Sequence, residues 1–275
     1  MAKIQKTVNT ADKKPVYRVK EKPTLTGILA TLFFTIISII FVSPIIIVII
    51  NSLKAKTFIS LETFELPNEH SYIGLDNYKT AITQYDFIKA VGWTVVITVL
   101  SVVAILLFCS MTAWYITRVK NIATKIIYLL CVFSMVIPFQ MVMFTLAGTA
   151  DALHLNTPWG IVIVYLGFGT GLAVFMFCGF IKSIPLEVEE AAMIDGCTPL
   201  KTFFRVVIPI MKPTYISVGI LEAMWIWNDF LLPYLVLDIK KYKTISIVVQ
   251  YMKGSYGRVD MGAIMACLVM AIIPV

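Results

Sequence analysis

The sequence predicts an all-α, polytopic membrane protein with about six transmembrane helices. Three observations support this class: 59% of the 275 residues are hydrophobic, 14% are charged, and the mean hydropathy is +0.87. A soluble domain is roughly half apolar and about one quarter charged. In lipid, a helix satisfies its own backbone hydrogen bonds, so the long apolar runs of this chain are expected to be transmembrane helices.

The first 24 residues are polar and basic, and they lack the apolar core of a cleaved signal peptide. We therefore expect a cytoplasmic N-terminal arm over residues 1–24. A single transmembrane domain is expected over residues 25–275.

Five apolar runs reach the length of about 20 residues that a transmembrane helix requires. A sixth run begins near Met261, and its 15 residues up to Val275 cover about 22 Å of a hydrocarbon core about 30 Å thick. We therefore expect the native protein to continue past Val275. The five complete runs are Thr26 to Ile50, Val91 to Ile116, Ile126 to Leu146, Trp159 to Ile181 and Tyr215 to Leu237.

The distribution of basic residues predicts the orientation, because cytoplasmic segments carry an excess of lysine and arginine. With the N-terminus inside, fourteen of the 23 lysines and arginines face the cytoplasm and nine face outward. This arrangement makes residues 53–89 an outer loop and residues 183–212 a cytoplasmic loop. It also accounts for the net charge of +7 without nucleic acid as a partner.

The cytoplasmic loop 183–212 is too polar for lipid and is expected to form two short helices joined by a turn. Pro185 suits a first helical position, and Gly196 can adopt the left-handed conformation that ends a helix. Thr198 is expected to cap the second helix, which starts at Pro199. On this architecture alone, a simple connector and a functional hairpin are about equally supported.

The same loop resembles the permease subunits of ATP-binding-cassette importers. The family signature is Glu-Ala-Ala, three residues, Gly, nine residues, Ile, one residue and Leu-Pro. The chain matches it at full spacing, with aliphatic substitutions at two apolar positions. The matching residues are Glu190, Ala191, Ala192, Gly196, Val206, Ile208 and Pro209.

Further stretches resemble the carbohydrate branch of that family, the maltose-importer type. The chain departs from the branch at Gly171, where proline is usual, and at Cys178, where arginine is frequent. The resembling stretches are Asn51 to Lys54, Gly74 to Tyr78, Ile137 to Gln140, Leu153 to Thr157, Ile194 to Gly196, Ile208 to Pro213 and Trp227 to Phe230.

The resemblance implies the type I importer fold in the inner (plasma) membrane of a bacterium. It implies half of a two-subunit pore for a sugar or oligosaccharide, with a second homologous permease subunit as partner in a heterodimer. It also implies two copies of a cytoplasmic ATPase, which bind ATP and Mg, and an extracytoplasmic sugar-binding protein. The hairpin would couple to the ATPase through Glu190, Ala191, Ala192, Asp195, Gly196 and Pro209.

No phosphate-binding Gly-Lys-Ser/Thr loop occurs in the chain, so we expect no ATPase activity and no bound cofactor. The five cysteines and two histidines are not spaced as metal ligands, so we expect no metal site. Gly167, Gly169 and Gly171 lie inside an apolar run, where they favour close helix packing over nucleotide binding.

Ionisable residues inside a membrane span often mark a transport pathway. Glu222 and Asp229 are seven residues apart, which would place them on one helix face with Trp225. We predict that they line the pore, with Gln140 as a weaker candidate. A role in joining neighbouring helices is an equally supported reading of the two carboxylates.

The last outer loop contains the candidate contacts for the binding protein, namely Lys253, Gly254, Ser255 and Tyr256. The resemblance implies this role, and a flexible connector is the alternative. Three other functions are alternatives for the whole chain. They are an importer of another small solute such as a polyamine, an ion-coupled secondary transporter, and an intramembrane enzyme, for which no catalytic set is evident.

Overall fold

The computed structural model describes residues 4–7, 16–19, 24–253 and 259–274. Two short strands, β1 and β2, pair antiparallel with Ile4 opposite Val19, and every later element is helical. The membrane domain is therefore all-helical, as predicted, and within the described residues the strands are confined to the arm. The elements are β1 (Ile4–Thr7), β2 (Val16–Val19), α1 (Leu25–Ser52), α2 (Lys56–Leu61), α3 (Asp76–Gln84), α4 (Phe87–Arg118), α5 (Ile122–Phe133), α6 (Phe139–Ala152), α7 (Gly160–Ile181), α8 (Leu186–Ile194), α9 (Pro199–Thr202), η1 (Phe203–Val207, a π-helix), α10 (Ile208–Ile210), α11 (Lys212–Asn228), α12 (Leu231–Val236), α13 (Ile245–Met252) and α14 (Met261–Ile272).

Within the described residues, three helices are long and apolar enough to cross a membrane by themselves: α1, α4 and α7. A fourth candidate span is the bent pair Pro199–Ile210 and Lys212–Asn228, whose two parts meet at 78°. Helices α5 and α14 are apolar but shorter. Each of the six apolar runs in the sequence thus contributes at least one helix.

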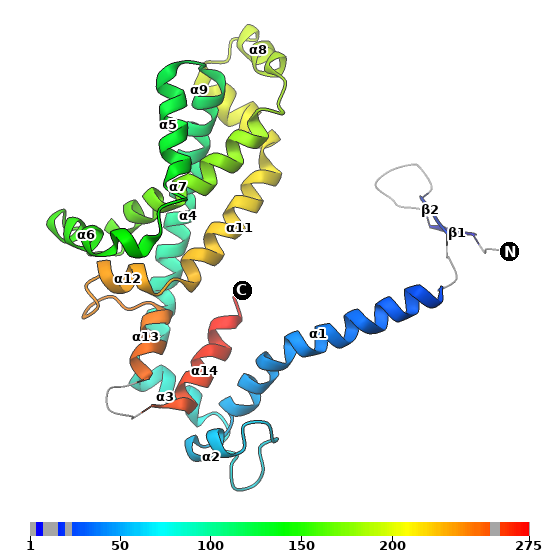
Figure 1. Ribbon diagram of the computed structural model, residues 1–275, viewed down its shortest axis with the longest axis vertical. Coiled ribbons are helices and arrows are strands. Elements are labelled where there is room, and N and C mark those ends of the chain that lie inside the picture. Colours follow the sequence, from blue (N-terminus) through cyan, green and yellow to red (C-terminus); the bar gives the residue numbers. More distant parts are fainter. Residues whose placement is uncertain (1–3, 8–15, 20–23, 254–258, 275) are drawn as a thin grey trace.

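The core of the molecule is a bundle of α4, α7 and α11, with α5 packed on α7 (Figure 1). Fully buried side chains such as Ile105, Tyr165 and Phe177 fill the centre of this bundle. The predicted close packing at the glycines of α7 is confirmed at two positions. A Cβ atom added to Gly169 would lie 3.0 Å from Glu222 Oε2, and one added to Gly171 would lie 2.8 Å from the carbonyl oxygen of Cys131.

The expected single helix from Ile126 to Leu146 is wrong. Helix α5 ends at Phe133, and α6 begins at Phe139 and runs across the bundle (Figure 1). Pro138 is extended, with φ −61° and ψ 131°, and it directly precedes α6. A proline at that point lacks the backbone N–H that would continue the helix, so the apolar run divides there.

The run from Tyr215 to Leu237 is also divided. Helix α11 ends at Asn228, because Asp229 is extended with φ −71° and ψ 131°. A short helix, α12, follows. Asp229 therefore does not continue the helix face that carries Glu222, which corrects the expected alignment of the two carboxylates.

The segment 53–89, predicted to be an outer loop, packs against α14 and is held together by hydrogen bonds from buried polar side chains. The Lys54 side chain is fully buried, and its Nζ donates hydrogen bonds of 2.6 Å to the carbonyl oxygens of Glu62 and Glu65. Asn77 Nδ2 donates to the carbonyl oxygens of Ser52 at 2.8 Å and Lys54 at 2.9 Å. These bonds satisfy buried polar groups that would otherwise be costly and give the loop a defined shape.

Helix α1 extends away from the bundle and packs against α14 near its own C-terminal end (Figure 1). None of its most apolar 18-residue window is buried within the chain. Side chains such as Phe33, Phe34 and Phe41 are more than half exposed. An apolar surface of this extent requires lipid or another membrane protein as a neighbour.

Candidate functional site: a helical hairpin clamped to the bundle

The segment 183–212 forms the predicted helical hairpin at one end of the bundle (Figure 1). Helix α8 ends at Ile194, and Gly196, two residues later, has a left-handed φ of +82°. Cys197 N–H donates to the carbonyl of Ala192, and Gly196 N–H donates to that of Met193, both at 3.0 Å. These two bonds constitute a Schellman motif, which confirms the turn expected at Gly196.

The second helix starts as predicted. Thr198 is extended, and its hydroxyl accepts a hydrogen bond from the backbone N–H of Lys201 at 3.4 Å. Pro199 is the first helical residue, a position where its missing N–H costs nothing. Pro185 stands one position before the helix, as the N-cap residue of α8, instead of inside it.

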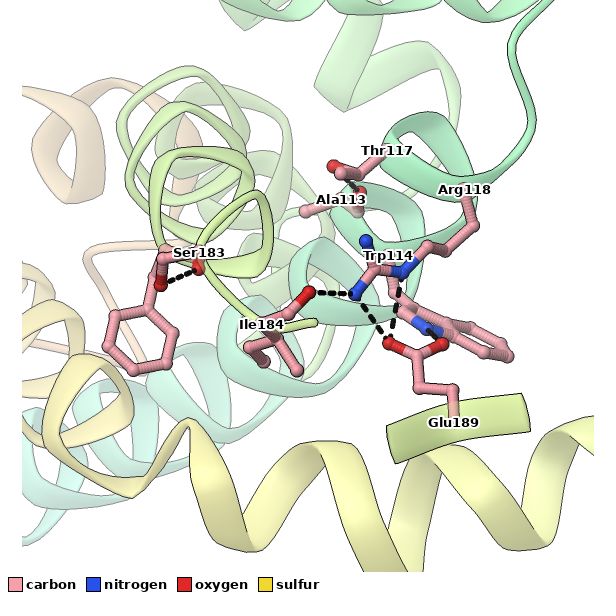
Figure 2. A network of polar contacts seen from close by, with 8 residues as sticks. Ala113, Trp114, Thr117, Arg118, Ser183, Ile184 and Glu189 are labelled. Atoms are coloured by element: carbon pink, nitrogen blue, oxygen red, sulfur yellow. Dashed lines mark hydrogen bonds and ion pairs between the residues drawn. The ribbon is translucent and has the colours of Figure 1, made fainter. Parts of the chain in front are cut away.

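A polar network fixes α8 to the end of α4, and Figure 2 shows it at close range. Arg118 Nη2 donates to Glu189 Oε1 at 2.6 Å, and Arg118 Nε donates to the same oxygen at 2.9 Å. Trp114 Nε1 donates to Glu189 Oε2 at 2.9 Å. Both carboxylate oxygens of Glu189 are therefore occupied, and its side chain is only 2% exposed.

Arg118 also reaches the start of the hairpin. Its Nη2 donates to the carbonyl oxygen of Ile184 at 3.1 Å (Figure 2). One guanidinium thus contacts both the chain entering α8 and a side chain within α8. A charge-assisted contact of this kind is strong when it is shielded from water, so the hairpin is held to α4 as one body.

The sequence analysis did not identify this role of Glu189. Its partner Arg118 lies 71 residues earlier in the chain, so no local spacing could have linked them. A weak signal was present, since Trp114 and Arg118 are four residues apart and share one face of α4 near its C-terminal end.

The candidate coupling residues lie on the outer side of the hairpin. Glu190, Ala191, Asp195 and Gly196 are exposed, and Ala192 is partly exposed. Pro209, further along in α10, is exposed as well. The exposed apolar side chains beside them are Leu186, Val188, Met193, Ile194 and Leu200. An exposed apolar patch of this kind, rimmed by charges, fits a protein partner.

The candidate pore residues do not form one cluster. Glu222 is 1% exposed, and its Oε1 lacks a hydrogen-bond partner within the described residues. Asp229 Oδ2 accepts a hydrogen bond from the Tyr165 hydroxyl at 3.1 Å, and its Oδ1 accepts one from the Leu231 N–H at 3.0 Å. Asp229 thus caps α12 and ties it to α7, in agreement with the helix-joining reading of this residue.

Trp225 is the member of the set that reaches the surface. It is 40% exposed, and its ring meets that of Tyr165 edge-on, with centroids 5.5 Å apart. Gln140 is exposed on α6, and no hydrogen bond joins it to Glu222 or Asp229 in the part of the chain that the structure describes. Of the candidate binding-protein contacts, Lys253 is exposed at the end of α13, whereas Gly254, Ser255 and Tyr256 lie outside the described residues.

Residues 105–275 match the family of the binding-protein-dependent transport system inner membrane component. The chain is 39% identical to the probable starch degradation products transport system permease protein of Thermoanaerobacterium thermosulfurigenes, over 90% of this chain and 89% of that protein. It is 35% identical to the multiple sugar-binding transport system permease protein of Streptococcus mutans, over 74% and 73% of the two chains.

A solved structure has a similar fold. It is the crystal structure of a bacterial alginate transporter of the ATP-binding-cassette class in complex with an alginate pentasaccharide-bound periplasmic protein. One of its chains superposes with a TM-score of 0.58 at 18% sequence identity, covering 89% of this chain and 91% of that one. At this identity the likeness concerns the fold alone.

Proposed function

This chain belongs to the family of binding-protein-dependent transport system inner membrane components, and from that premise we propose that it forms half of the pore of an ATP-driven importer for a sugar or oligosaccharide. The family consists of permease subunits of ATP-binding-cassette transporters, which are multi-pass proteins of the inner membrane. The cargo proposal is supported by the names of the relatives, which refer to starch degradation products and to multiple sugars.

The observation that carries the proposed mechanism is the clamped hairpin. Its outer face exposes Glu190, Ala191 and a set of apolar side chains, while Glu189 on its inner face is held by Arg118 of α4. Because of this contact, a movement of the hairpin would be transmitted directly to α4, a helix of 32 residues. We infer that a cytoplasmic ATPase subunit docks on this face and that its closure reorients α4 and the helices packed on it.

The proposed complex has two permease subunits, this chain and a homologous companion. The exposed apolar surface of α1 is supporting evidence, since a second membrane subunit would cover part of it. Two ATPase subunits would bind ATP and Mg²⁺, and this chain would bind neither. The N-terminus would face the cytoplasm of a bacterium, and Lys253 together with the loop after it would face an extracytoplasmic binding protein.

Within the pore, we propose that Trp225 provides a stacking surface for the apolar C–H face of a sugar. Its side chain is 40% exposed and its ring packs edge-on with that of Tyr165, so part of the indole surface is accessible to a ligand. Glu222, Asp229 and Gln140 remain candidates for polar contacts, with Asp229 also serving as a helix cap.

The proposal is tested by reconstituting this chain with its companion, its ATPase and its binding protein in vesicles. Oligosaccharides are then screened for stimulation of ATP hydrolysis and for uptake. We expect stimulation by at least one sugar and none by polyamines. Uptake by this chain without an ATPase, driven by an ion gradient, would refute the proposal.

A further inference from the structure

A cavity of about 790 Å³ opens at the hairpin end of the bundle. It lies between the end of α4, the start of α5 and the end of α7. It is separate from Glu222, Trp225 and Asp229, none of which lines it. Its lining residues are Ile116, Thr117, Arg118, Lys120, Asn121, Ile122, Thr124, Lys125, Tyr128, Cys178 and Lys182.

The charges on the cavity wall are all positive. Lys120, Lys125, Lys182 and Arg118 line it, and no carboxylate does. Glu189 neutralises Arg118 from outside the lining, whereas no salt bridge engages the three lysines within the described residues. Three uncompensated ammonium groups around one concave, partly apolar space focus a positive potential into it and favour an anion.

The cations come from separate elements whose positions are fixed. Asn121 and Thr124 form a reciprocal capping box at the start of α5, and the buried Thr124 hydroxyl also donates to the carbonyl of Val119 at 2.7 Å. These hydrogen bonds fix the short segment between α4 and α5 that carries Lys120. Lys182 Nζ lies 5.8 Å from the centre of the Tyr128 ring, which attracts the cation from across the cavity. The three lysines are exposed side chains carried by a backbone of defined position, so a ligand would meet three cations around one cavity.

Apolar side chains also lie at the cavity and on the helix α5 that borders it. Ile116 and Ile122 belong to the lining, and Ile126, Leu129 and Leu130 of α5 are exposed beyond it. A ligand with an anionic head and a hydrocarbon tail would satisfy both regions. Basic pockets between transmembrane helices at the cytoplasmic surface have this character when they bind acidic lipids.

We propose that this cavity binds a phosphate group at the inner membrane surface, with the head group of an anionic phospholipid as its occupant in the membrane. A phospholipid head group and a soluble phosphate ester of the cytoplasm both carry the phosphate group that this cavity would recognise. The assignment to the inner leaflet rests on the orientation given under the proposed function. The presence of the positively charged cavity does not depend on that orientation.

The experiment uses the purified complex of this chain with its partner subunits in a neutral detergent. Binding of phosphatidylglycerol with a fluorescent acyl chain is measured, and phosphatidylcholine with the same label is the reference lipid. Lys120→Gln, Lys125→Gln and Lys182→Gln should each weaken phosphatidylglycerol binding about fivefold, the effect expected for one basic residue at an anionic surface. Lys212→Gln, an exposed lysine at the same end but outside the cavity, is the matched control and should leave binding unchanged.

Glycerol phosphate added at constant ionic strength distinguishes the two sources of phosphate. Retention of the labelled lipid assigns the site to a phospholipid, and displacement assigns it to a soluble phosphate ester. Equal binding of both lipids, or equal affinity in the wild type and all three cavity variants, would overturn the proposal. ATP hydrolysis is measured on the same samples, so that a failure of the lipid-site proposal can be told from a failure of the proposed importer function. Loss of coupling without loss of lipid binding would count against the importer function and leave the lipid-site proposal intact.

Discussion

At the scale of single residues, Glu189 is the side chain on which the coupling mechanism depends most. It is buried, and both of its oxygens are engaged by Arg118 and Trp114. Removing one partner from a buried ion pair leaves an uncompensated charge, which costs about 3–5 kcal/mol. The hairpin should then detach from α4 before the rest of the bundle unfolds.

Arg118→Met is therefore expected to lower sugar-stimulated uptake far more than it lowers basal ATP hydrolysis. Uptake per ATP hydrolysed, measured in reconstituted vesicles, checks this. The matched control is the exposed pair Lys79 and Asp76, which spans 3.0 Å, because Lys79→Met removes a salt bridge that contributes only about 0–1 kcal/mol. If Arg118→Met and Lys79→Met behaved alike, the clamp would have no role in coupling.

The pore residues give a second prediction at this scale. Trp225→Ala and Glu222→Ala should both slow uptake while the complex still assembles. Trp225 offers an exposed ring to the sugar, and Glu222 is a buried carboxylate whose Oε1 has no hydrogen-bond partner within the described residues. Uptake of labelled sugar and recovery of intact complex on size-exclusion chromatography measure the two properties. Unchanged transport in both variants would contradict the assignment.

Some single-residue roles could be predicted from the sequence, whereas contacts between distant residues could not. The roles of Gly196 and Thr198 followed from local backbone chemistry, and the structure confirms both. The contacts of Glu189 with Arg118 and of Asp229 with Tyr165 join residues 71 and 64 positions apart. Such pairs depend on how helices pack, which the spacing of residues along one helix does not determine.

At the scale of elements, the turn of the hairpin is set by the left-handed backbone of Gly196. A side chain with a branched Cβ is strained there, whereas asparagine tolerates the conformation. Gly196→Val should therefore disturb the angle between α8 and α9 and reduce uptake per ATP hydrolysed several-fold. Gly196→Asn should retain most of the coupling, and equal coupling in the two variants would show that the turn geometry is unimportant.

The outer-loop segment offers a stability test. A Cβ atom at Gly262 of α14 would overlap the side chain of Asn77, which donates two buried hydrogen bonds to the chain near Lys54. Gly262→Ala should lower the free energy of unfolding by about 1–3 kcal/mol for each bond lost. Gly148→Ala is the control, because no atom outside its own helix lies within 4 Å of its added Cβ. Thermal unfolding of the purified complex compares them, and equal midpoints would contradict the packing described.

Hydropathy located the apolar segments but not the breaks within them. The run from Ile126 to Leu146 reads as one span because its residues are apolar throughout, yet Pro138 separates α5 from α6. Likewise, the end of α11 before Asp229 follows from a side chain that caps the next helix. A hydropathy window measures the transfer of side chains into lipid and does not detect changes in backbone direction.

At the scale of the whole molecule, composition and one motif were enough to predict an importer permease, and the family match over residues 105–275 confirms that class. The sequence alone could not show which surfaces meet a partner, because those surfaces are apolar whether lipid or protein covers them. The exposed faces of α1 and of the hairpin identify the places where partners are expected.

In the proposed mechanism, the hairpin lies on the ATP side of the membrane and contacts the ATPase. Glu190→Cys and Glu69→Cys place exposed thiols on the hairpin and on the opposite outer-loop segment, in a background where Cys131 and Cys197 are serine. We predict that a membrane-impermeant maleimide added to intact cells labels only Glu69→Cys. Glu190→Cys should react after permeabilisation and should cross-link to the ATPase subunit in the assembled complex. Labelling of Glu190→Cys from outside intact cells would contradict the account.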